Sequence, residues 1–312
     1  MSSFTRRRFL GAVAAAGAAS VLRPARALAD SAPGGPILTK PIPSSPNGET
    51  LPLVGLGSWI TFNVGDDPAG RDSSAEVMRA FFAEGGRMID SSPMYGSSQE
   101  VIGYGLRKLG HPQQLFAATK VWINSGAKGP EQIEESRRFW GVPRFDLLAV
   151  HNLMSWEEHL PTLFAMKQAG RLRYVGCTTS EGRRHDEMEK VMRTQPIDFV
   201  QVSYNALDRD VESRILPVAR ERRIPVICNR PFRRGELIHR VEHAPLPSFA
   251  AEIDCANWAQ LLLKFIVSHP AVICAIPATT RVDHVRQNVG ASYGRMPDEA
   301  LRRRIVDAVE KI

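Results

Sequence analysis

The segment 115–151 reads LFAATKVWINSGAKGPEQIEESRRFWGVPRFDLLAVH, and it determines the predicted fold. Short apolar runs at 115–120 and 147–151 have the length and composition of buried strands. Between them, residues 131–139 have the spacing of an amphipathic helix. A strand, a helix and a second strand in this order predict two parallel strands that are joined by a right-handed crossover.

The same alternation continues in both directions from this segment. Further strands are predicted at 54–58, 88–90, 174–178, 199–203, 225–229 and 273–277. Helices are predicted at 73–84, 98–109, 157–169, 184–193, 211–222, 257–268, 282–290 and 297–312. Eight strand–helix units in about 260 residues fit an α/β fold of the closed (β/α)8 TIM-barrel kind better than an open doubly wound sheet. No G-x-G-x-x-G follows the first strand, which argues further against a dinucleotide-binding open sheet.

Two segments outside the regular units have their own predictions. Extended runs at 37–42 and 50–54 flank Asn47-Gly48, which is typical of a β-hairpin turn. We expect this N-terminal hairpin to close the bottom of the barrel, so that the barrel domain covers 37–312. A long insertion at about 233–256 follows the seventh predicted strand.

The first 29 residues have the parts of a secretory signal. Thr5-Arg6-Arg7-Arg8-Phe9-Leu10 forms a basic head, 11–22 is apolar, and Ala27-Leu28-Ala29 supplies small residues before a cleavage point. An amphipathic first helix is the alternative, but this segment has no acidic residue and no polar face. We therefore expect a signal peptide at 1–29 and a tether at 30–36.

The signal segment resembles a twin-arginine signal, S/T-R-R-x-F-L. That resemblance implies the twin-arginine translocase as a partner and export of the folded protein, often with its cofactor already bound. The location would then be periplasmic or otherwise extracytoplasmic. The sequence leaves open whether the signal is cleaved or retained as an anchor.

Composition limits the classes of partner. The formal net charge is +7, and five arginines with no acids lie in 1–29, so the remaining chain carries only about +2. The high charge therefore does not indicate nucleic-acid binding. Hydrophobic residues make up 43% of the chain, enough for a sizeable core. No apolar run after the N-terminus reaches the roughly 18 residues of a membrane-spanning helix, so no stable membrane insertion is expected after processing.

The four cysteines are Cys177, Cys228, Cys255 and Cys274. None of them forms a C-x-x-C pair, so no metal site is expected. Three of them lie in predicted strands, and buried thiols are the favoured interpretation. Export would also permit a disulfide.

Polar side chains end several of the predicted strands. In such a barrel, working residues come from the carboxyl ends of the strands. Asp90, Lys120 and His151 stand there, and Tyr95 follows Asp90 in the same loop. Each of them alone could have a structural role, as a helix cap, a packing ring or a solvated charge. Together they place a carboxylate, an ammonium, an imidazole and a phenol on one rim.

These four groups suit proton donation to a carbonyl oxygen. A free tyrosine has a pKa near 10, and a neighbouring ammonium group favours its phenolate form and lowers that value. Asp90 would keep Lys120 charged and oriented, and a neutral His151 would donate a hydrogen bond to the substrate. The sequence shows no strong nucleophile and no metal cage, so hydride must come from a cofactor.

Several segments resemble the aldo/keto reductase family. IDSSPMYGSSQEVIG at 89–103 is similar to the signature D-T-A-x-x-Y-G-x-S-E-x-x-x-G of that family. Thr119-Lys120-Val121 and His151-Asn152 resemble its lysine and histidine strands. GLGSW at 55–59 resembles its first strand, and QVSYN at 201–205 its sixth. IPATTR at 276–281, through Asn288, resembles its phosphate-binding segment. The resemblance covers nearly all of 37–312.

The resemblance implies a reduction of aldehyde or ketone carbonyls by NADPH, with NADH possible, bound extended across the barrel mouth. Tyr95 would be the acid, Lys120 and Asp90 would tune it, and His151 would orient the small-molecule substrate. Trp59 and Trp122 would wall the substrate pocket, and the insertion at 233–256 would fold over the cofactor. The implied cofactor contacts are Thr178, Thr179, Gln201, Arg230, Thr279, Thr280, Arg281 and Asn288.

The chain also departs from the family pattern. Thr178-Thr179 stands where Ser-Asn is usual, and CNRPF at 228–232 lacks the tyrosine that stacks on the nicotinamide in many members. Arg230 could stack there instead or contact the pyrophosphate. No basic residue follows Ile276-Pro277, and His284 stands where some NADPH-specific members have arginine. Arg281 is the best remaining cation near the adenosine end, so NADPH is predicted over NADH.

These departures leave an alternative function open. The chain could be a catalytically weak or inactive barrel that binds a nucleotide or a sugar as a sensor or subunit. A hydrolytic barrel enzyme is disfavoured because no opposed pair of carboxylates is evident.

Overall fold

The computed structural model describes residues 35–312, so the predicted signal at 1–29 and residues 30–34 of the predicted tether lie outside it. Eight parallel strands form one sheet whose spatial order follows the chain. They are β3 (Leu56–Gly57), β4 (Met88–Asp90), β5 (Phe116–Val121), β6 (Phe145–Val150), β7 (Leu172–Thr178), β8 (Phe199–Ser203), β9 (Val226–Asn229) and β10 (Val272–Ala275).

The sheet closes on itself between its first and last strands. The backbone N–H of Gly55 donates to the Ala275 carbonyl at 2.9 Å, and that of Gly57 donates to the Pro277 carbonyl at 3.0 Å. Bridges pair Val54 with Ala275 and Gly57 with Ala278 in the parallel sense. The prediction of a TIM barrel is therefore confirmed.

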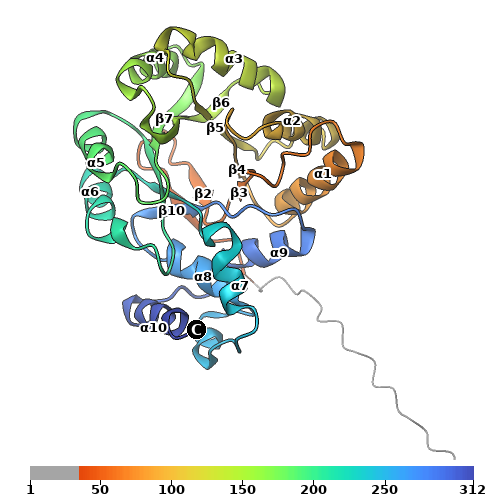
Figure 1. Cartoon of the computed structure of the whole chain (residues 1–312), viewed down its shortest axis with the longest axis vertical. Helices are drawn as coiled ribbons and strands as arrows, with labels where there is room; N and C mark the ends of the chain where they lie inside the picture. Colours follow the sequence, from red (N-terminus) through yellow and green to blue (C-terminus); the bar gives the residue numbers. More distant parts are fainter. Residues whose placement is uncertain (1–34) are drawn as a thin grey trace, which may run out of the picture. The chain divides into compact units, whose positions relative to one another are not determined.

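Helices separate the strands and surround them in Figure 1. They are α1 (Pro68–Ala83), α2 (Ser98–Lys108), α3 (Gly129–Trp140), α4 (Trp156–Gln168), α5 (His185–Thr194), α6 (Ile215–Arg222), α7 (Glu236–Val241), α8 (Trp258–Val267), α9 (Val282–Gly290) and α10 (Glu299–Glu310).

Local hydrogen bonding and backbone conformation set the ends of these helices. At the start of α1, the Asp67 carboxylate accepts from two backbone N–H groups. Gly141 ends α3 in the left-handed region, with a φ of 66°.

Several predicted boundaries differ from the structure, and two of them fall at 3-10 turns. The predicted helix at 211–222 begins instead with a 3-10 turn at Asp210–Glu212, and α6 starts only at Ile215. The predicted strand at 147–151 ends at Val150, because His151 opens a 3-10 turn in which Asn152 has a φ of 54°. The insertion at 233–256 is the segment that contains α7 and a longer 3-10 helix, Ser248–Ile253.

Side chains of the barrel strands divide into two apolar clusters. The larger cluster contains the residues that pack against the helices, such as Ile89, Leu148 and Val200. The smaller one contains the alternate positions Met88, Phe116, Leu147, Tyr174, Phe199, Ile227 and Ile273, one or more from each strand from β4 to β10. Because successive side chains of a strand point to opposite faces, the smaller cluster fills the barrel interior.

The predicted hairpin forms and closes one end of this interior. β1 (Thr39–Pro41) and β2 (Thr50–Pro52) pair antiparallel. The side chains of Ile42 and Leu51, next to and within these strands, belong to the interior cluster. Lys40 Nζ donates to the carbonyls of Val267, His269 and Val272 at 2.6 to 2.8 Å. The hairpin is thereby fastened to the segment that leads into β10.

The remaining sequence predictions for the body concern thiols and membrane helices. All four cysteines are buried with free thiols, so the prediction of buried thiols is confirmed and no disulfide links them. Within residues 35–312, no helix combines the length and the apolar character that a membrane span requires.

Candidate active site

Asp90 and Lys120 form a buried ion pair at the carboxyl end of the sheet. Asp90 is the last residue of β4, and Lys120 lies in the adjacent strand β5. Lys120 Nζ is 2.6 Å from Asp90 Oδ2 and also donates to the Ser91 carbonyl at 2.8 Å. Gln201 of β8 donates from Nε2 to the other carboxylate oxygen of Asp90 at 3.0 Å. The pair is therefore fixed by hydrogen bonds from both sides.

The surroundings keep Lys120 charged. Burial alone lowers the pKa of Lys120, because it removes water from the ammonium group. The negative charge of Asp90 and the phenol of Tyr95 act in the opposite direction and are together stronger. The net pKa of Lys120 is raised, so a positive charge is maintained in the barrel mouth at neutral pH.

Tyr95 lies against both Lys120 and His151. Its ring centroid is 5.2 Å from Lys120 Nζ, and its ring meets that of His151 edge to face, with the centroids 5.7 Å apart. Asn63 supports the loop, because its Oδ1 accepts from the Ser97 backbone N–H at 3.0 Å. The structure thus brings the predicted acid into contact with the predicted ammonium and imidazole.

The pKa of Tyr95 differs in direction from the sequence expectation. Lys120 does lower this pKa, as expected, but burial of the phenol raises it more, and the charge of Asp90 adds to the increase. The net pKa is raised above its ordinary value. The phenol is therefore fully protonated at neutral pH, which is the form that a proton donor requires.

His151 is held as a neutral imidazole. Its side chain is only 6% exposed, and Ser92 Oγ lies 2.7 Å from Nδ1. Burial, with a smaller effect from the charge of Lys120, lowers the pKa of His151 to about 2. If the Ser92 hydroxyl donates to Nδ1, the proton of the neutral ring is on Nε2, where it can serve a substrate oxygen.

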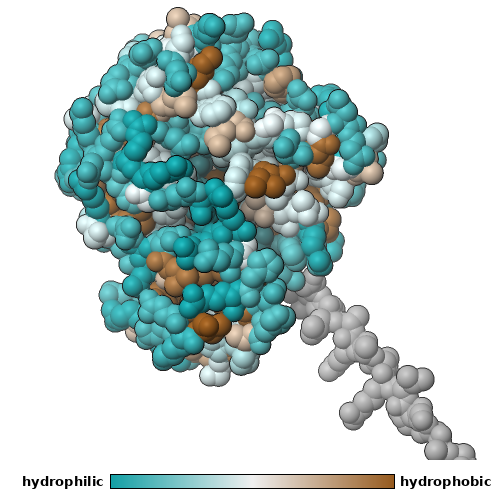
Figure 2. Space-filling view, viewed as in Figure 1, coloured by the Kyte–Doolittle hydropathy of each residue, from teal (hydrophilic) through white to brown (hydrophobic). Residues whose placement is uncertain are grey.

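Trp59 and Trp122 stand on the rim beside these groups. Trp122 is 37% exposed, and the side-chain amide of Gln132 bonds to both its backbone N–H and its carbonyl, at 2.7 and 2.9 Å. Trp59 is half-buried, with the guanidinium of Arg234 4.5 Å above its ring. Ile60, next to Trp59, and Met94, next to Tyr95, are also exposed apolar side chains. Figure 2 shows scattered apolar patches on a largely hydrophilic face of the molecule.

The two threonines at the end of β7, Thr178 within it and Thr179 directly after it, have unequal hydrogen bonding. The hydroxyl of Thr178 accepts from the Asn152 backbone N–H at 3.1 Å. Thr179 is 2% exposed, and its backbone N–H donates to the Gln201 carbonyl at 2.9 Å. Its hydroxyl is buried and has no hydrogen-bond partner among the described residues. A buried hydroxyl without a partner costs free energy, which a hydrogen bond from a ligand would recover.

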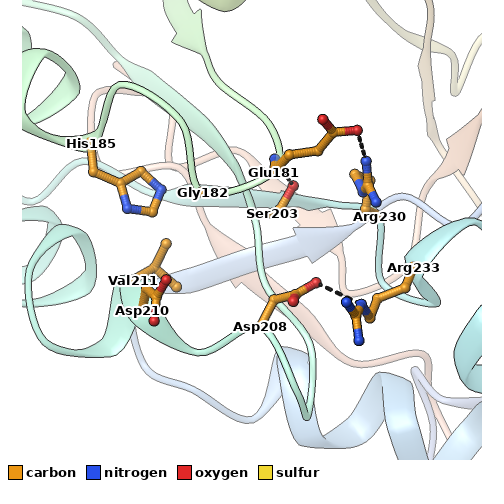
Figure 3. A pocket seen from close by; sticks show the side chains of 9 residues that line it. All are labelled: Glu181, Gly182, His185, Ser203, Asp208, Asp210, Val211, Arg230 and Arg233. Atoms are coloured by element: carbon orange, nitrogen blue, oxygen red, sulfur yellow. Dashed lines mark hydrogen bonds and ion pairs between the residues drawn. The ribbon is translucent and has the colours of Figure 1, made fainter.

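Arg230 lies in an ion-pair cluster next to these threonines. Glu181 forms ion pairs with Arg230, and with Arg234 at 2.7 Å. Arg230 and Glu181 line a cavity of about 260 Å³ that the loops after β7, β8 and β9 surround (Figure 3). The Arg230 guanidinium is therefore directed toward Glu181 in this structure.

The predicted phosphate-binding segment surrounds the start of α9. Thr279 is buried, and its hydroxyl accepts from the Arg281 backbone N–H at 3.1 Å. Thr280 is exposed, whereas Asn288 within α9 is buried. Arg281 is exposed, and its guanidinium pairs with Asp283 at 2.5 Å. A helix N-terminus with an adjacent arginine is a suitable site for a phosphate group, although Asp283 competes for that arginine.

A comparison with known families agrees with this geometry. The model of the aldo/keto reductase family matches residues 53–304. The chain belongs to the aldo/keto reductase family.

Individual relatives of this aldo/keto reductase are distant in sequence. It is 27% identical to methylglyoxal reductase YeaE of Escherichia coli over 246 residues, which cover 77% of this chain and 84% of that one. It is 25% identical to an NADH-specific methylglyoxal reductase of the same organism, over 87% of this chain and 100% of that one. Among solved structures, an aldo/keto reductase from Klebsiella pneumoniae in complex with NADP and acetate matches with a TM-score of 0.71. The identity is 23%, over 84% of this chain and 93% of that one.

Sequence reasoning missed several polar residues in this aldo/keto reductase. Ser92, the partner of His151, lies within the signature segment, and its position two residues after Asp90 is the only sequence signal for it. Ser203 was recognised only as a polar residue at the end of a predicted strand, and Glu181 had no signal at all, because their partners are far away in the sequence. Asn229 was noted only as the residue that replaces a tyrosine.

Proposed function

We propose that this aldo/keto reductase reduces aldehydes or ketones to alcohols, with Tyr95 as the proton donor and NADPH or NADH as the source of hydride. One observation carries the proposal: a buried ion pair of Lys120 and Asp90 lies directly beside a protonated Tyr95 and a neutral His151. This set can donate a proton to a carbonyl oxygen but cannot itself supply a hydride.

The residues present fit a nicotinamide cofactor. The unpartnered hydroxyl of Thr179 can bond to the carboxamide of the nicotinamide, next to Gln201. The N-terminus of α9, with Arg281, can take a phosphate of the adenosine end. When bound, such a cofactor supplies the hydride that reduces the carbonyl carbon.

The protein's own groups then act on the carbonyl oxygen. His151 donates a hydrogen bond from Nε2 and fixes the direction of the oxygen. Tyr95 transfers its phenolic proton to this oxygen. Lys120 stabilises the phenolate that remains, and Asp90 keeps the ammonium group in place. Trp59 and Trp122 exclude water from the reacting face.

Relatives guide the choice of substrate and cofactor for a test. Two Escherichia coli relatives are named methylglyoxal reductases, so a small aldehyde of this kind is the first substrate to assay. We expect NADPH to bind more tightly than NADH, because Arg281 offers a charge-assisted hydrogen bond to a 2′-phosphate.

The test of the acid is Tyr95→Phe, which keeps the ring but removes the transferable proton. Turnover in aldehyde-dependent NADPH oxidation should fall by roughly 10² to 10⁴, while the cofactor dissociation constant stays within about twofold. Undiminished turnover would falsify the proposed role. A wild-type protein that binds cofactor but reduces no aldehyde or ketone would support the alternative of a binding barrel.

We propose further that the protein is exported folded by the twin-arginine translocase to an extracytoplasmic location. The sequence around Arg6 and Arg7 supports this. Replacing both by lysine should retain the precursor in the cytoplasm, and the exported wild type should begin near Asp30 by N-terminal mass spectrometry. Normal export of the double variant would exclude this route.

A further inference from the structure

Asn229 ties together the ends of three neighbouring strands. It is the last residue of β9, and its side-chain Nδ2 donates to the Thr179 carbonyl, directly after β7, at 2.9 Å. Its Oδ1 accepts from Ser203 Oγ, at the end of β8, at 2.6 Å. β7, β8 and β9 are adjacent in the sheet, so one amide group spans all three carboxyl ends.

Ser203 extends this tie to the loop that follows β7. Its hydroxyl oxygen also accepts from the Glu181 backbone N–H at 3.0 Å, and Figure 3 shows the two residues at the wall of the same cavity. Asn229 therefore holds residue 179 by its carbonyl, and Ser203 holds residue 181 by its N–H. The Thr179 N–H is held in turn by the Gln201 carbonyl at 2.9 Å. The short segment 179–181 is thus fixed at both ends.

The side chain at the centre of this arrangement is the unpartnered hydroxyl of Thr179. The residue is 2% exposed, so water cannot readily satisfy its oxygen. A protein that fixes a buried hydroxyl without a partner loses free energy unless a ligand supplies the hydrogen bond. By contrast, the hydroxyl of Thr178 already has a partner in the backbone of Asn152.

We infer that Asn229, acting with Ser203, is a positioning residue that holds the Thr179 hydroxyl in place for the carboxamide of the nicotinamide. The inference rests on the proposed function. Both polar atoms of the Asn229 amide are used within the protein, so it acts through Thr179. Asn229 stands where many family members have a stacking tyrosine, so this chain holds its cofactor by a hydrogen-bonded tie at that position.

The variant Asn229→Tyr distinguishes a hydrogen-bonding role of Asn229 from the mere absence of a stacking tyrosine at this position. Asn229→Tyr introduces the residue that many relatives carry, but it removes both hydrogen bonds that fix 179–181. We expect it to weaken cofactor binding, although a restored stacking residue alone would strengthen binding. Tighter binding of NADPH by Asn229→Tyr would overturn the inference.

The decisive experiment is a double-mutant cycle on the full exported chain. NADPH and NADH dissociation constants are measured by fluorescence titration for the wild type, Thr179→Val, Asn229→Ala and the double variant. Each single change should weaken binding about 3- to 10-fold, the range of one net hydrogen bond. If Asn229 acts through Thr179, the double variant should bind no more weakly than the weaker single variant. If instead the double variant raises the dissociation constant by the product of the two single factors, the residues act independently and the inference is wrong.

Controls separate positioning from a general loss of stability. Asn229→Ala should change the Michaelis constant for the cofactor while the turnover number at saturating cofactor and its pH profile stay the same. Asp298→Ala removes the cap of α10, where the carboxylate accepts from the Leu301 N–H at 2.8 Å. It should lower the melting temperature but leave the dissociation constant unchanged. If Asp298→Ala weakened cofactor binding as much as Asn229→Ala does, Asn229 would have only a structural role.

A second variant keeps the test decisive if Asn229→Ala fails to fold. Ser203→Ala removes a single hydroxyl and both of its hydrogen bonds, and it should weaken cofactor binding to a similar extent. An unchanged dissociation constant for Ser203→Ala would overturn the inference.

If the wild type binds neither NADPH nor NADH, the proposed function fails. If the wild type binds and the tie variants bind equally well, only this inference fails.

Discussion

Lys120 Nζ lies 2.6 Å from Asp90 Oδ2, with only 1% and 5% of the two side chains exposed. Such a pair gains little net stability, because both charges lose water when they are buried. Removing one partner is costly, however, because the other charge is left uncompensated. The pair therefore places a fixed positive charge beside Tyr95 and makes the site sensitive to any change in either residue.

Replacing Lys120 by methionine should affect both stability and turnover. The Asp90 charge would remain buried without its cation, which we expect to cost about 3–5 kcal/mol of the free energy of unfolding. Turnover should also fall, because no ammonium stabilises the phenolate of Tyr95. Urea denaturation and aldehyde reduction measure the two effects. The double change Lys120→Met with Asp90→Asn should recover part of the stability, and a fully stable single variant would contradict this account.

The neutral His151 should make the fold sensitive to acid. Its pKa is about 2 in the folded protein and about 6.5 when unfolded, so the unfolded chain binds more protons between these values. The stability that His151 contributes is therefore complete above about pH 6.5 and is lost as the pH falls below it.

Urea denaturation at pH 7.5 and pH 5 can measure this linkage. Between these values the wild type should lose about 2 kcal/mol more of its unfolding free energy than His151→Gln does. His239, whose side chain is 78% exposed, provides the control, because His239→Gln should keep the wild-type dependence. Equal acid sensitivity of the wild type and His151→Gln would show that this residue is not held neutral by burial.

Glu49 should matter for stability but not for catalysis. From the connection between β1 and β2, its carboxylate pairs with Arg173, and with Arg87 at 3.1 Å, and accepts from the Tyr174 hydroxyl at 3.0 Å. These contacts lie at the barrel end opposite to the candidate active site. Glu49→Gln should lower the free energy of unfolding by about 1–3 kcal/mol and leave the turnover of folded enzyme unchanged.

The matched control for this change is Glu76→Gln on the outer face of α1. Glu76 pairs with Arg79 at 3.2 Å, and both side chains are about half exposed. Exposed pairs of this kind contribute less than about 0.5 kcal/mol. Chemical denaturation should therefore separate the two variants, and equal losses of stability would argue against the stabilising role of Glu49.

Arg281 and Asp283 should control the choice between NADPH and NADH. Arg281→Ala should weaken NADPH binding by about tenfold with little effect on NADH, because only NADPH carries the 2′-phosphate. Asp283→Asn should have the opposite effect. It frees the guanidinium and removes a carboxylate that would repel the phosphate. The ratio of the two dissociation constants is the measurement, and an unchanged ratio in both variants would place the phosphate site elsewhere.

Local patterns were sufficient to predict the barrel and the four central residues. The alternation of apolar runs with segments of helical spacing can be recognised from residues that are close together along the chain. Closure into a barrel then follows from the count of eight strand–helix units. Because strand ends converge at one rim, the positions of Asp90, Tyr95, Lys120 and His151 in the sequence also predicted that they meet. Boundaries such as the 3-10 turn at His151 were not predictable from the sequence, because they depend on contacts with neighbouring segments at the end of each strand.

The sequence by itself thus determined the fold, the family and the types of group at the barrel mouth. Only the tertiary structure decided how these groups behave. The pKa of Tyr95 is raised because burial of the ring outweighs the charge of Lys120, and both depend on every atom packed around the site. Arg230 turns to Glu181, and Asn229 bonds to Thr179 and Ser203, across intervals of 26 to 50 residues. Such distant pairings have no local signal, because they form only after the strands are adjacent.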